Sequence, residues 1–434
     1  MAALPRKRPD GTIGEKKRGG QNMRNVTPRP VSGLMVAAVN AWFVCATVCA
    51  VAAPIEDPPT TSAATVVGAQ VRGTNYEIDD TVRSDGFLYI FSLNTTYGRY
   101  QVEGLDLLKI RLRELGAVAA LEKMNKSQAY LDAASKAAMK PINLATGLVT
   151  NPVGTVEQSM SGVGALFSRI GSSAANIGHD RDDVADSTLG VSSAKRKIAN
   201  KLGVDPYTDF KPLADALEDM ARVTALGDLT VSAAFMAIPG GAGMAVSYSK
   251  TGQEVEQMVL EKTPSELRDV NKAKLSAMGV PGPAISAFLD NTFYTPTDQT
   301  IIVASLVKMS GVANRGLFVK RASQASNRNL AVFIRHRAQL LAAHHSRVEP
   351  FADFLEVRGL PLNRTRSGKV VIVVPFDELA WTKQMSDLVA VIDQEVKQRK
   401  LGTGIEVRTT GTATPVARDG LSEQGWKLFE NISP

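Results

Sequence analysis

The chain has 434 residues, with 50 Lys and Arg, 43 Asp and Glu, and a formal net charge of +7. The first 52 residues carry 8 of the bases and 2 of the acids, which leaves 42 bases against 41 acids in the rest. This near-neutral remainder excludes nucleic acid as an expected partner, and its length predicts two or three domains, each with its own core.

The N-terminal residues have the pattern of an export signal. Arg24 and Arg29 precede an apolar run of 20 residues from Leu34 to Ala53, interrupted only by Asn40. The run ends in small residues that a signal peptidase recognises, and these predict cleavage after position 52: Ala50, Ala52 and Ala53. We therefore expect residues 1–52 to be a signal peptide and the mature protein to be periplasmic or secreted.

Two features of this leader leave alternatives open. A run of 20 apolar residues is longer than most signal cores and close to the ~20 that span a bilayer, so an uncleaved anchor with the protein facing outward is the competing interpretation. Translation from Met23 instead of Met1 would shorten the basic segment to an ordinary length. Both cysteines, Cys45 and Cys49, lie in the leader, so the cleaved protein has no disulfide or cysteine metal site.

The next residues predict a tether followed by a small sheet. Pro54, Pro58 and Pro59, with the adjacent Thr and Ser residues, predict a Pro/Thr-rich tether over 53–75. Short strand patterns separated by turn residues then predict a β meander over 76–102, with strands at 76–78, 87–93 and 99–102.

A helical body is expected over 103–350, divided into two parts near 141–190, where Gly, Ser and Asn accumulate. Its first helix is predicted from apolar residues spaced by three and four: Leu105, Leu108, Leu112, Leu115 and Val118. Thr263-Pro264-Ser265-Glu266 is a capping box, and Thr295-Pro296-Thr297-Asp298 repeats its Thr-Pro start with an acid in the first turn. Both sequences predict the first residues of a helix.

The last part, 351–434, predicts a small α/β module of strand, helix, strand, helix and strand. Val370 to Val374 is a β-branched run typical of a strand buried on both faces. Asp377 is expected to cap the helix that follows, and a second strand is expected around Ile405 and Val407. Thr414-Pro415 predicts a short helix that ends at Gly425, before a third strand at 426–430. The chain as a whole is thus predicted to be mainly α.

No motif supports a catalytic, cofactor or metal assignment. Ser192-x-x-Lys195 and Lys250-Thr251-Gly252 resemble two elements of penicillin-binding proteins, but the third element, Ser-x-Asn, is absent. The glycines at 240–243 form an incomplete phosphate loop, and His336 and His344 lie two helical turns apart, too far to share a compact metal site. We assign no catalytic, cofactor or metal residues.

One charge feature stands out in the helical body. The 50 residues between Asp298 and Glu349 contain no acid. Their bases are expected to form a face for an anionic partner, either lipid, polysaccharide or an envelope protein: Lys308, Arg315, Lys320, Arg321, Arg328, Arg335, Arg337 and Arg347. The alternative, which we favour, is that the acidic stretches 205–219 and 254–269 pack beside these bases and neutralise them.

These observations predict an exported cell-envelope protein that binds or scaffolds and is not an enzyme. A membrane-active helical protein, using residues 141–178 and 226–248, is one alternative. A secreted hydrolase whose carboxylates meet only in the folded chain is another.

Overall fold

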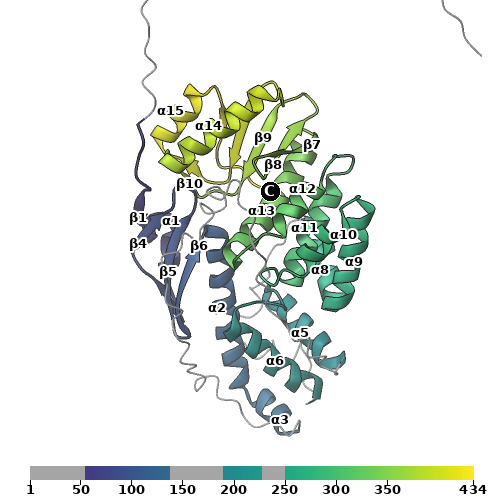
Figure 1. Cartoon of the computed structure of the whole chain (residues 1–434). Coiled ribbons are helices and arrows are strands. Elements are labelled where there is room, and N and C mark those ends of the chain that lie inside the picture. Colours follow the sequence, from purple (N-terminus) through teal and green to yellow (C-terminus); the bar gives the residue numbers. More distant parts are fainter. Residues whose placement is uncertain (1–53, 137–188, 227–249) are drawn as a thin grey trace, which may run out of the picture. The chain divides into compact units, whose positions relative to one another are not determined.

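A computed structural model describes residues 54–136, 189–226 and 250–434 (Figure 1). Helices hold 54% of the described residues and strands 18%, with an antiparallel sheet near the N-terminus and a mixed sheet near the C-terminus. The expected leader with its cleavage residues, and almost all of the two segments of the membrane-active alternative, lie outside the described residues. No helix in the described ranges is long and apolar enough to cross a membrane.

The N-terminal sheet is built around β5, which pairs with β3 and β4 on one edge and β6 on the other. Its strands are β1 (Thr60–Ser62), β2 (Arg72–Gly73), β3 (Tyr76–Ile78), β4 (Thr81–Ser84), β5 (Tyr89–Thr95) and β6 (Gly98–Glu103). The three predicted strands are confirmed, and β4 and the two strands within the expected tether were not predicted.

The expected tether is wrong for residues 60–73. Thr60 to Ser62 pair antiparallel with Arg83 to Thr81, and Ser62 caps the short helix α1 (Ala63–Val67). The 3-10 turn η1 (Gly68–Val71) and β2 follow. Composition failed here because this segment is ordered by pairing with β4, by burial of Ala63 and by packing of Val66, Val67 and Val71 against the neighbouring hydrophobic core.

The helices of the body form two groups. The first is α2 (Leu105–Asn125), α3 (Gln128–Lys136), α5 (Leu189–Leu202) and α6 (Lys211–Leu226), which share a core with the N-terminal sheet. The second is α8 (Lys250–Glu261), α9 (Pro264–Ala277), α10 (Gly282–Leu289), α11 (Pro296–Lys308), α12 (Gly316–Ala322) and α13 (Arg328–Arg347). Both predicted Thr-Pro helix starts are confirmed, and each has the reciprocal bonds of a capping box.

Helix α2 follows the predicted stripe only in part. Leu108, Leu115 and Val118 are buried as expected, but the buried face is wider and includes Arg111 and Glu114. Hydrophobic spacing cannot predict these two, because a buried charge depends on a partner from another segment.

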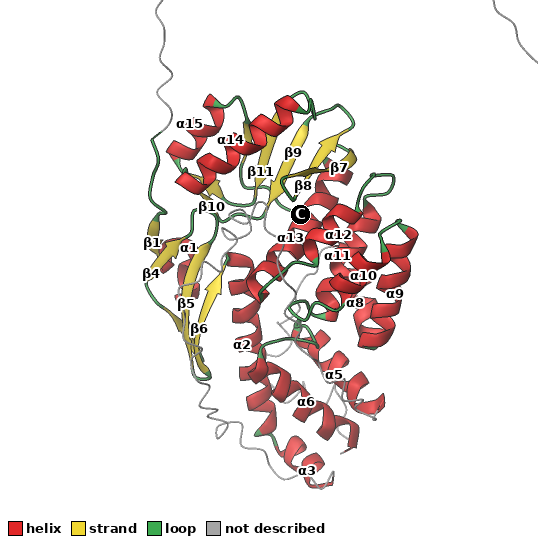
Figure 2. Cartoon of the chain, in the orientation of Figure 1, coloured by secondary structure: helices red, strands yellow, loops and turns green. Residues whose placement is uncertain are grey.

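The C-terminal module contains a five-stranded mixed sheet in the order β13-β11-β9-β8-β7, with α14 and α15 packed against it (Figure 2). Its elements are β7 (Phe351–Val357), β8 (Leu360–Thr365), β9 (Val370–Val374), β10 (Glu378–Leu379), α14 (Lys383–Gln398), β11 (Ile405–Thr409), β12 (Thr412–Ala413), α15 (Pro415–Glu423) and β13 (Lys427–Phe429). The predicted alternation from β9 to β13 is confirmed. The hairpin of β7 and β8 adds two strands, so "mainly α" understates the strand content.

The core does not divide where the sequence suggested. Residues of α9 to α13 lie in the same hydrophobic cluster as the strands and helices of the C-terminal module. The helical body and the module are therefore joined by a continuous core near residue 350.

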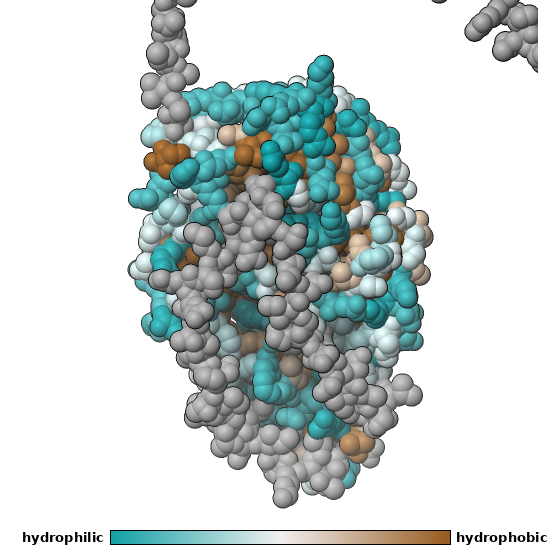
Figure 3. Space-filling view, in the orientation of Figure 1, coloured by the Kyte–Doolittle hydropathy of each residue, from teal (hydrophilic) through white to brown (hydrophobic). Residues whose placement is uncertain are grey.

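On the surface, in the view of Figure 3, apolar side chains lie in separate small groups among hydrophilic ones.

The predicted cap at Asp377 is also wrong. Helix α14 begins after Thr382, whose hydroxyl accepts the backbone N–H of Met385. Asp377 is 8% exposed, and its Oδ2 accepts the N–H of Leu105 at 3.0 Å and that of Tyr89 at 3.1 Å. Asp377 thus caps α2, a helix that lies more than 270 residues earlier in the chain.

Candidate functional site

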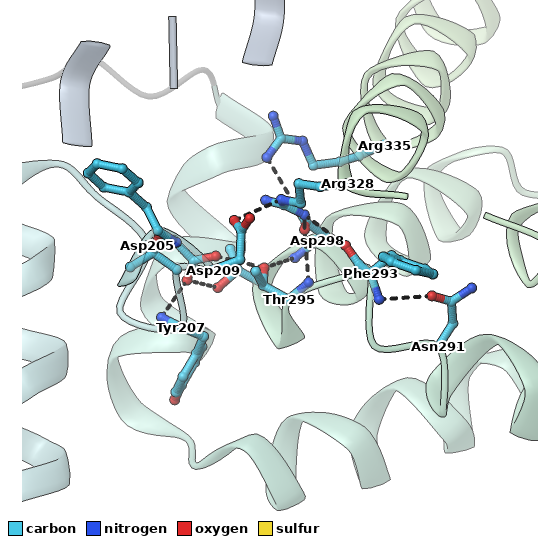
Figure 4. Close-up of polar contacts among 12 residues, drawn as sticks. Asp205, Tyr207, Asp209, Asn291, Phe293, Thr295, Asp298, Arg328 and Arg335 are labelled. Carbon is cyan, nitrogen blue, oxygen red and sulfur yellow. Dashed lines mark hydrogen bonds and ion pairs between the residues drawn. The ribbon is translucent and has the colours of Figure 1, made fainter. Parts of the chain in front are cut away.

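A network of buried charges surrounds the start of α11. Asp298 is 0% exposed and accepts the backbone N–H of Thr295 at 2.9 Å, as the capping box requires (Figure 4). The same carboxylate binds Arg328, and its other oxygen accepts Nη1 of Arg335 at 2.9 Å. Asp298 therefore joins the first turn of α11 to two turns of α13.

The loop between α5 and α6 supplies the other carboxylates of this network. Asp205 accepts the hydroxyls of Thr295 and Thr297, each at 2.7 Å, and the backbone N–H of Tyr207 at 3.0 Å (Figure 4). Asp209 lies 3.0 Å from Nε of Arg328, an ion pair without the alignment of a hydrogen bond. The loop holds both acids against α11 and α13 because each has partners there.

Helix α2 completes the network from the opposite side. Arg111 binds Asp209 at 2.5 Å and Glu114 at 2.7 Å, and Glu114 also accepts the hydroxyl of Thr208. Four segments that are far apart in sequence therefore meet through paired charges. Such a network is costly to bury unless every member has a partner, so it fixes the positions of the surrounding side chains.

The pKa values of these carboxylates diverge. Burial raises the pKa of Asp298, but Arg328 and Arg335 outweigh this and hold it well below its ordinary value. Burial, with the nearby charge of Asp298, raises the pKa of Asp205. Burial likewise raises the pKa of Glu114, despite Arg111. Burial also opposes ionisation of Asp209, but Arg111 and Arg328 outweigh this and lower its pKa.

A cavity of about 210 Å³ adjoins this network, here called the body cavity. Its walls come from α2, α5, α8, α11, α13 and the loop that holds Asp205. One part of the lining is apolar: Ile110, Val204, Val255, Val259, Leu260 and Ile301. The charged part contains four guanidinium groups and three carboxylates: Arg113, Arg196, Arg328, Arg335, Glu114, Asp205 and Glu256.

One arginine of the body cavity, Arg196, has hydrogen-bond donors left for a ligand. Arg196 is 7% exposed, and it donates from Nε to the carbonyl of Leu260 at 3.0 Å and from Nη1 to Ser192 at 2.6 Å. No carboxylate in the described ranges makes an ion pair with it. Nε of Arg335 also has no acceptor among the described residues, but it is fully buried and does not open into the cavity. The cavity therefore presents guanidinium donors that an anion would satisfy.

The structure divides the eight bases that were expected to form one face. Arg328 and Arg335 line the body cavity, where Asp209, from the first acidic stretch, pairs with Arg328. Arg337 is buried elsewhere, and Arg315 donates to the carbonyl of Leu306 at 3.0 Å. The remaining four are exposed or half-buried: Lys308, Lys320, Arg321 and Arg347. Sequence charge alone could not separate these groups, because the division depends on helix packing.

Three consecutive residues of α13 reach three different places. Arg335 binds Asp298, His336 binds Asp106 of α2, and Arg337 donates to the backbone carbonyls of Val373 and Pro361. Successive residues of an α-helix point about 100° apart, so one turn of α13 contacts α11, α2 and the C-terminal sheet.

A second group of carboxylates meets near His336. Glu103, Asp106 and Asp377 line a cavity of about 10 Å³, close to the size of one water molecule. Burial raises the pKa of Asp377 to about 7 and also raises that of Glu103, whose Oε2 has no partner among the described residues. Burial opposes ionisation of Asp106, but His336 outweighs this and lowers its pKa. Sequence reasoning did not find this group, because its members lie in three separate segments.

The chain matches no protein-family model, no curated protein and no solved structure. In the ranges that the structure describes, no group of three or more His, Cys, Asp or Glu side chains has an arrangement that would hold a metal ion. The geometry of the body cavity is therefore the main indication of function.

Proposed function

We propose that this protein is an exported binding protein of the cell envelope that holds a small organic anion in the body cavity. The observation that carries the proposal is Arg196, a buried guanidinium on the cavity wall without a carboxylate partner in the described chain. Leaving a charge unpaired in the interior is costly, and an anionic ligand would remove that cost.

The size and lining of the body cavity restrict the ligand. About 210 Å³ exceeds the ~150 Å³ that holds a benzene molecule and is below the ~300 Å³ of sites for drug-sized ligands. The apolar residues of α8 and α11 provide a surface for a ring or short chain, while the guanidinium groups provide donors for an acidic group. A small aromatic or branched carboxylate fits both requirements.

The charge network would serve as a rigid support for this ligand. Asp298 holds Arg328 and Arg335 in place through ion pairs, so these side chains lose little freedom when a ligand binds. Arg196, on the wall of the same cavity, would then contact the acidic group. Preorganisation of this kind increases affinity without new contacts.

The test is isothermal titration calorimetry of the purified protein with benzoate, benzyl alcohol, benzylamine and inorganic phosphate. We expect binding of benzoate alone, and a loss of about 10- to 100-fold in affinity in Arg196→Gln, the range for a hydrogen bond to a charged group. Arg222→Gln is the matched control, because Arg222 is exposed, pairs with Glu218 and does not line the cavity.

A second variant tests the proposal independently, in case Arg196→Gln does not fold. Val255→Phe leaves every guanidinium in place but fills the apolar part of the cavity, and it should also abolish benzoate binding. Equal affinity of benzoate for wild type and both variants would overturn the proposal. Binding of benzyl alcohol as tight as that of benzoate would overturn the role of the arginines.

Export is a separate part of the proposal and is supported by the leader sequence. Intact mass and N-terminal sequencing of the protein from its native cells would show a chain that begins at Ala53. An intact leader in the membrane fraction would replace this with the anchored form.

A hydrolase is the second candidate, favoured by the meeting of Glu103, Asp106 and Asp377 beside His336. Carboxylates with diverging pKa values are suited to general acid and base roles. The cavity there holds only about one water, so this candidate requires an opening motion. Absence of any difference in hydrolysis of ester and glycoside substrates between wild type and Glu103→Gln would remove it.

A further inference from the structure

The C-terminal module contains a second cavity, of about 50 Å³, here called the module cavity. It lies among strands β8, β9 and β11 and helices α13 and α14. Its lining is apolar except for two arginines, Arg321 and Arg337, and the apolar part includes Met385 and Val389 of α14. No residue of the body cavity is part of this lining.

Arg337 is the unusual member of this lining. It is 9% exposed, and burial, with the like charge of Arg321, lowers its pKa to about 10. Nε donates to the carbonyl of Val373 at 3.0 Å and Nη2 to that of Pro361 at 2.5 Å. No carboxylate among the described residues makes an ion pair with Arg337, and no described acceptor binds Nη1.

A guanidinium has five N–H donors, of which two are used here. The two carbonyls hold the plane of the group fixed relative to the sheet, so its free edge has a defined direction. A carboxylate is the natural partner of a fixed guanidinium edge, because it accepts two parallel bonds and supplies the missing charge.

We propose that the module cavity binds a short-chain aliphatic carboxylate, with the acidic group at Arg337 and the chain among the apolar side chains of α14 and the sheet. The cavity has the volume of about three to four water-sized probes, which suits a chain of two to four carbons and excludes a ring. The flexible side chain of Met385 allows small adjustments of this volume. This site is distinct from the body cavity and does not depend on its proposed function.

Met385 provides a direct reporter, since it lines the cavity and carries a methyl group that can be labelled. The experiment follows ¹³C-methyl methionine spectra of the protein during titration with propionate, and Met385→Leu assigns the signal. We expect a saturable shift of the Met385 signal with propionate, but none with propanol or propylamine at equal concentration.

Three variants test the assignment. Arg337→Gln should weaken propionate binding by about 10- to 100-fold. Val389→Phe keeps the guanidinium and fills the cavity, so it should abolish the shift even if Arg337→Gln is poorly folded. Arg196→Gln, which removes the body-cavity arginine, should leave it unchanged.

The outcomes separate this proposal from that for the body cavity. Failure of propionate to shift Met385, or an equal shift in Arg337→Gln or Val389→Phe, would overturn the module site. Loss of the propionate response in Arg196→Gln would also overturn it, by placing the bound propionate in the body cavity.

Discussion

Asp377 accepts the backbone N–H of Leu105 at 3.0 Å and so caps the first turn of a helix formed by a distant part of the chain. The cap residue of α2 itself, Gly104, has no side chain for this role. Helix N-termini leave donors unsatisfied and carry partial positive charge, so a carboxylate from the C-terminal module serves both needs. This bond joins the module to the N-terminal sheet and α2.

The first prediction concerns the pH dependence of this cap. Burial raises the pKa of Asp377 to about 7, so the folded protein binds a proton that the unfolded chain, with a carboxyl pKa of ~3.9, releases. The proton bound at Asp377 makes its full contribution to the free energy of unfolding below pH ~4, and this contribution is lost as the pH rises to ~7. Wild type should therefore lose roughly 3 to 5 kcal/mol of unfolding free energy relative to Asp377→Asn between pH 4 and 8.

Urea denaturation across this range measures the difference. The oxygen of the asparagine amide can still accept both backbone N–H groups, so the variant should fold. Asp387→Asn is the control, because Asp387 is exposed on α14 and pairs with Lys383. A parallel pH profile for wild type and Asp377→Asn would contradict the prediction.

The second prediction concerns Asp298. Asp298→Asn leaves Arg328 and Arg335 buried without this carboxylate, which should cost about 3 to 5 kcal/mol of unfolding free energy at pH 7. Because the folded pKa of Asp298 is lowered, its contribution is present above the unfolded pKa and falls as the medium becomes more acidic, so the variant should differ less from wild type at pH 3. Asp290→Asn, which breaks the exposed pair with Arg268, should cost less than about 1 kcal/mol.

The third prediction compares the two capping boxes. Thr263→Ala removes a cap at the solvent-accessible start of α9 and should cost about 1 kcal/mol. Thr295→Ala should cost about 1 to 3 kcal/mol more, because Thr295 is 1% exposed and also donates to Asp205, which would lose a buried hydrogen bond. Chemical denaturation of both variants gives the comparison, and equal costs would show that the bond to Asp205 is unimportant.

The fourth prediction is that Gly→Ala substitutions in two different helices have opposite effects on stability. A methyl group at Gly420 of α15 would overlap the indole ring of Trp381, so Gly420→Ala should destabilise the protein by about 1 to 3 kcal/mol. A methyl group at Gly116 of α2 meets nothing within 4 Å, so Gly116→Ala should stabilise it by about 0.5 to 1 kcal/mol. The midpoint of thermal unfolding should fall in Gly420→Ala and rise in Gly116→Ala. A shift in the same direction in both variants would contradict the packing described at one of the two glycines.

Predictions from sequence succeeded where the signal lies within a few neighbouring residues. The capping boxes at Thr263 and Thr295 consist of four residues each, and the buried strand at 370–374 is defined by its own side chains. The tether failed because its order depends on a partner strand, and Asp377 was assigned to the helix that follows it although its partner is α2. Local patterns specify elements but not their partners.

The sequence by itself therefore determined the first residues of α9, α11 and α15 and the acid-free composition of residues 299–348. Only the tertiary structure decided where the charges of that stretch go. Arg335, His336 and Arg337 are adjacent in sequence, yet they contact α11, α2 and the C-terminal sheet. The physical reason is that helical geometry fixes the three directions, while packing of the other segments decides what each direction meets.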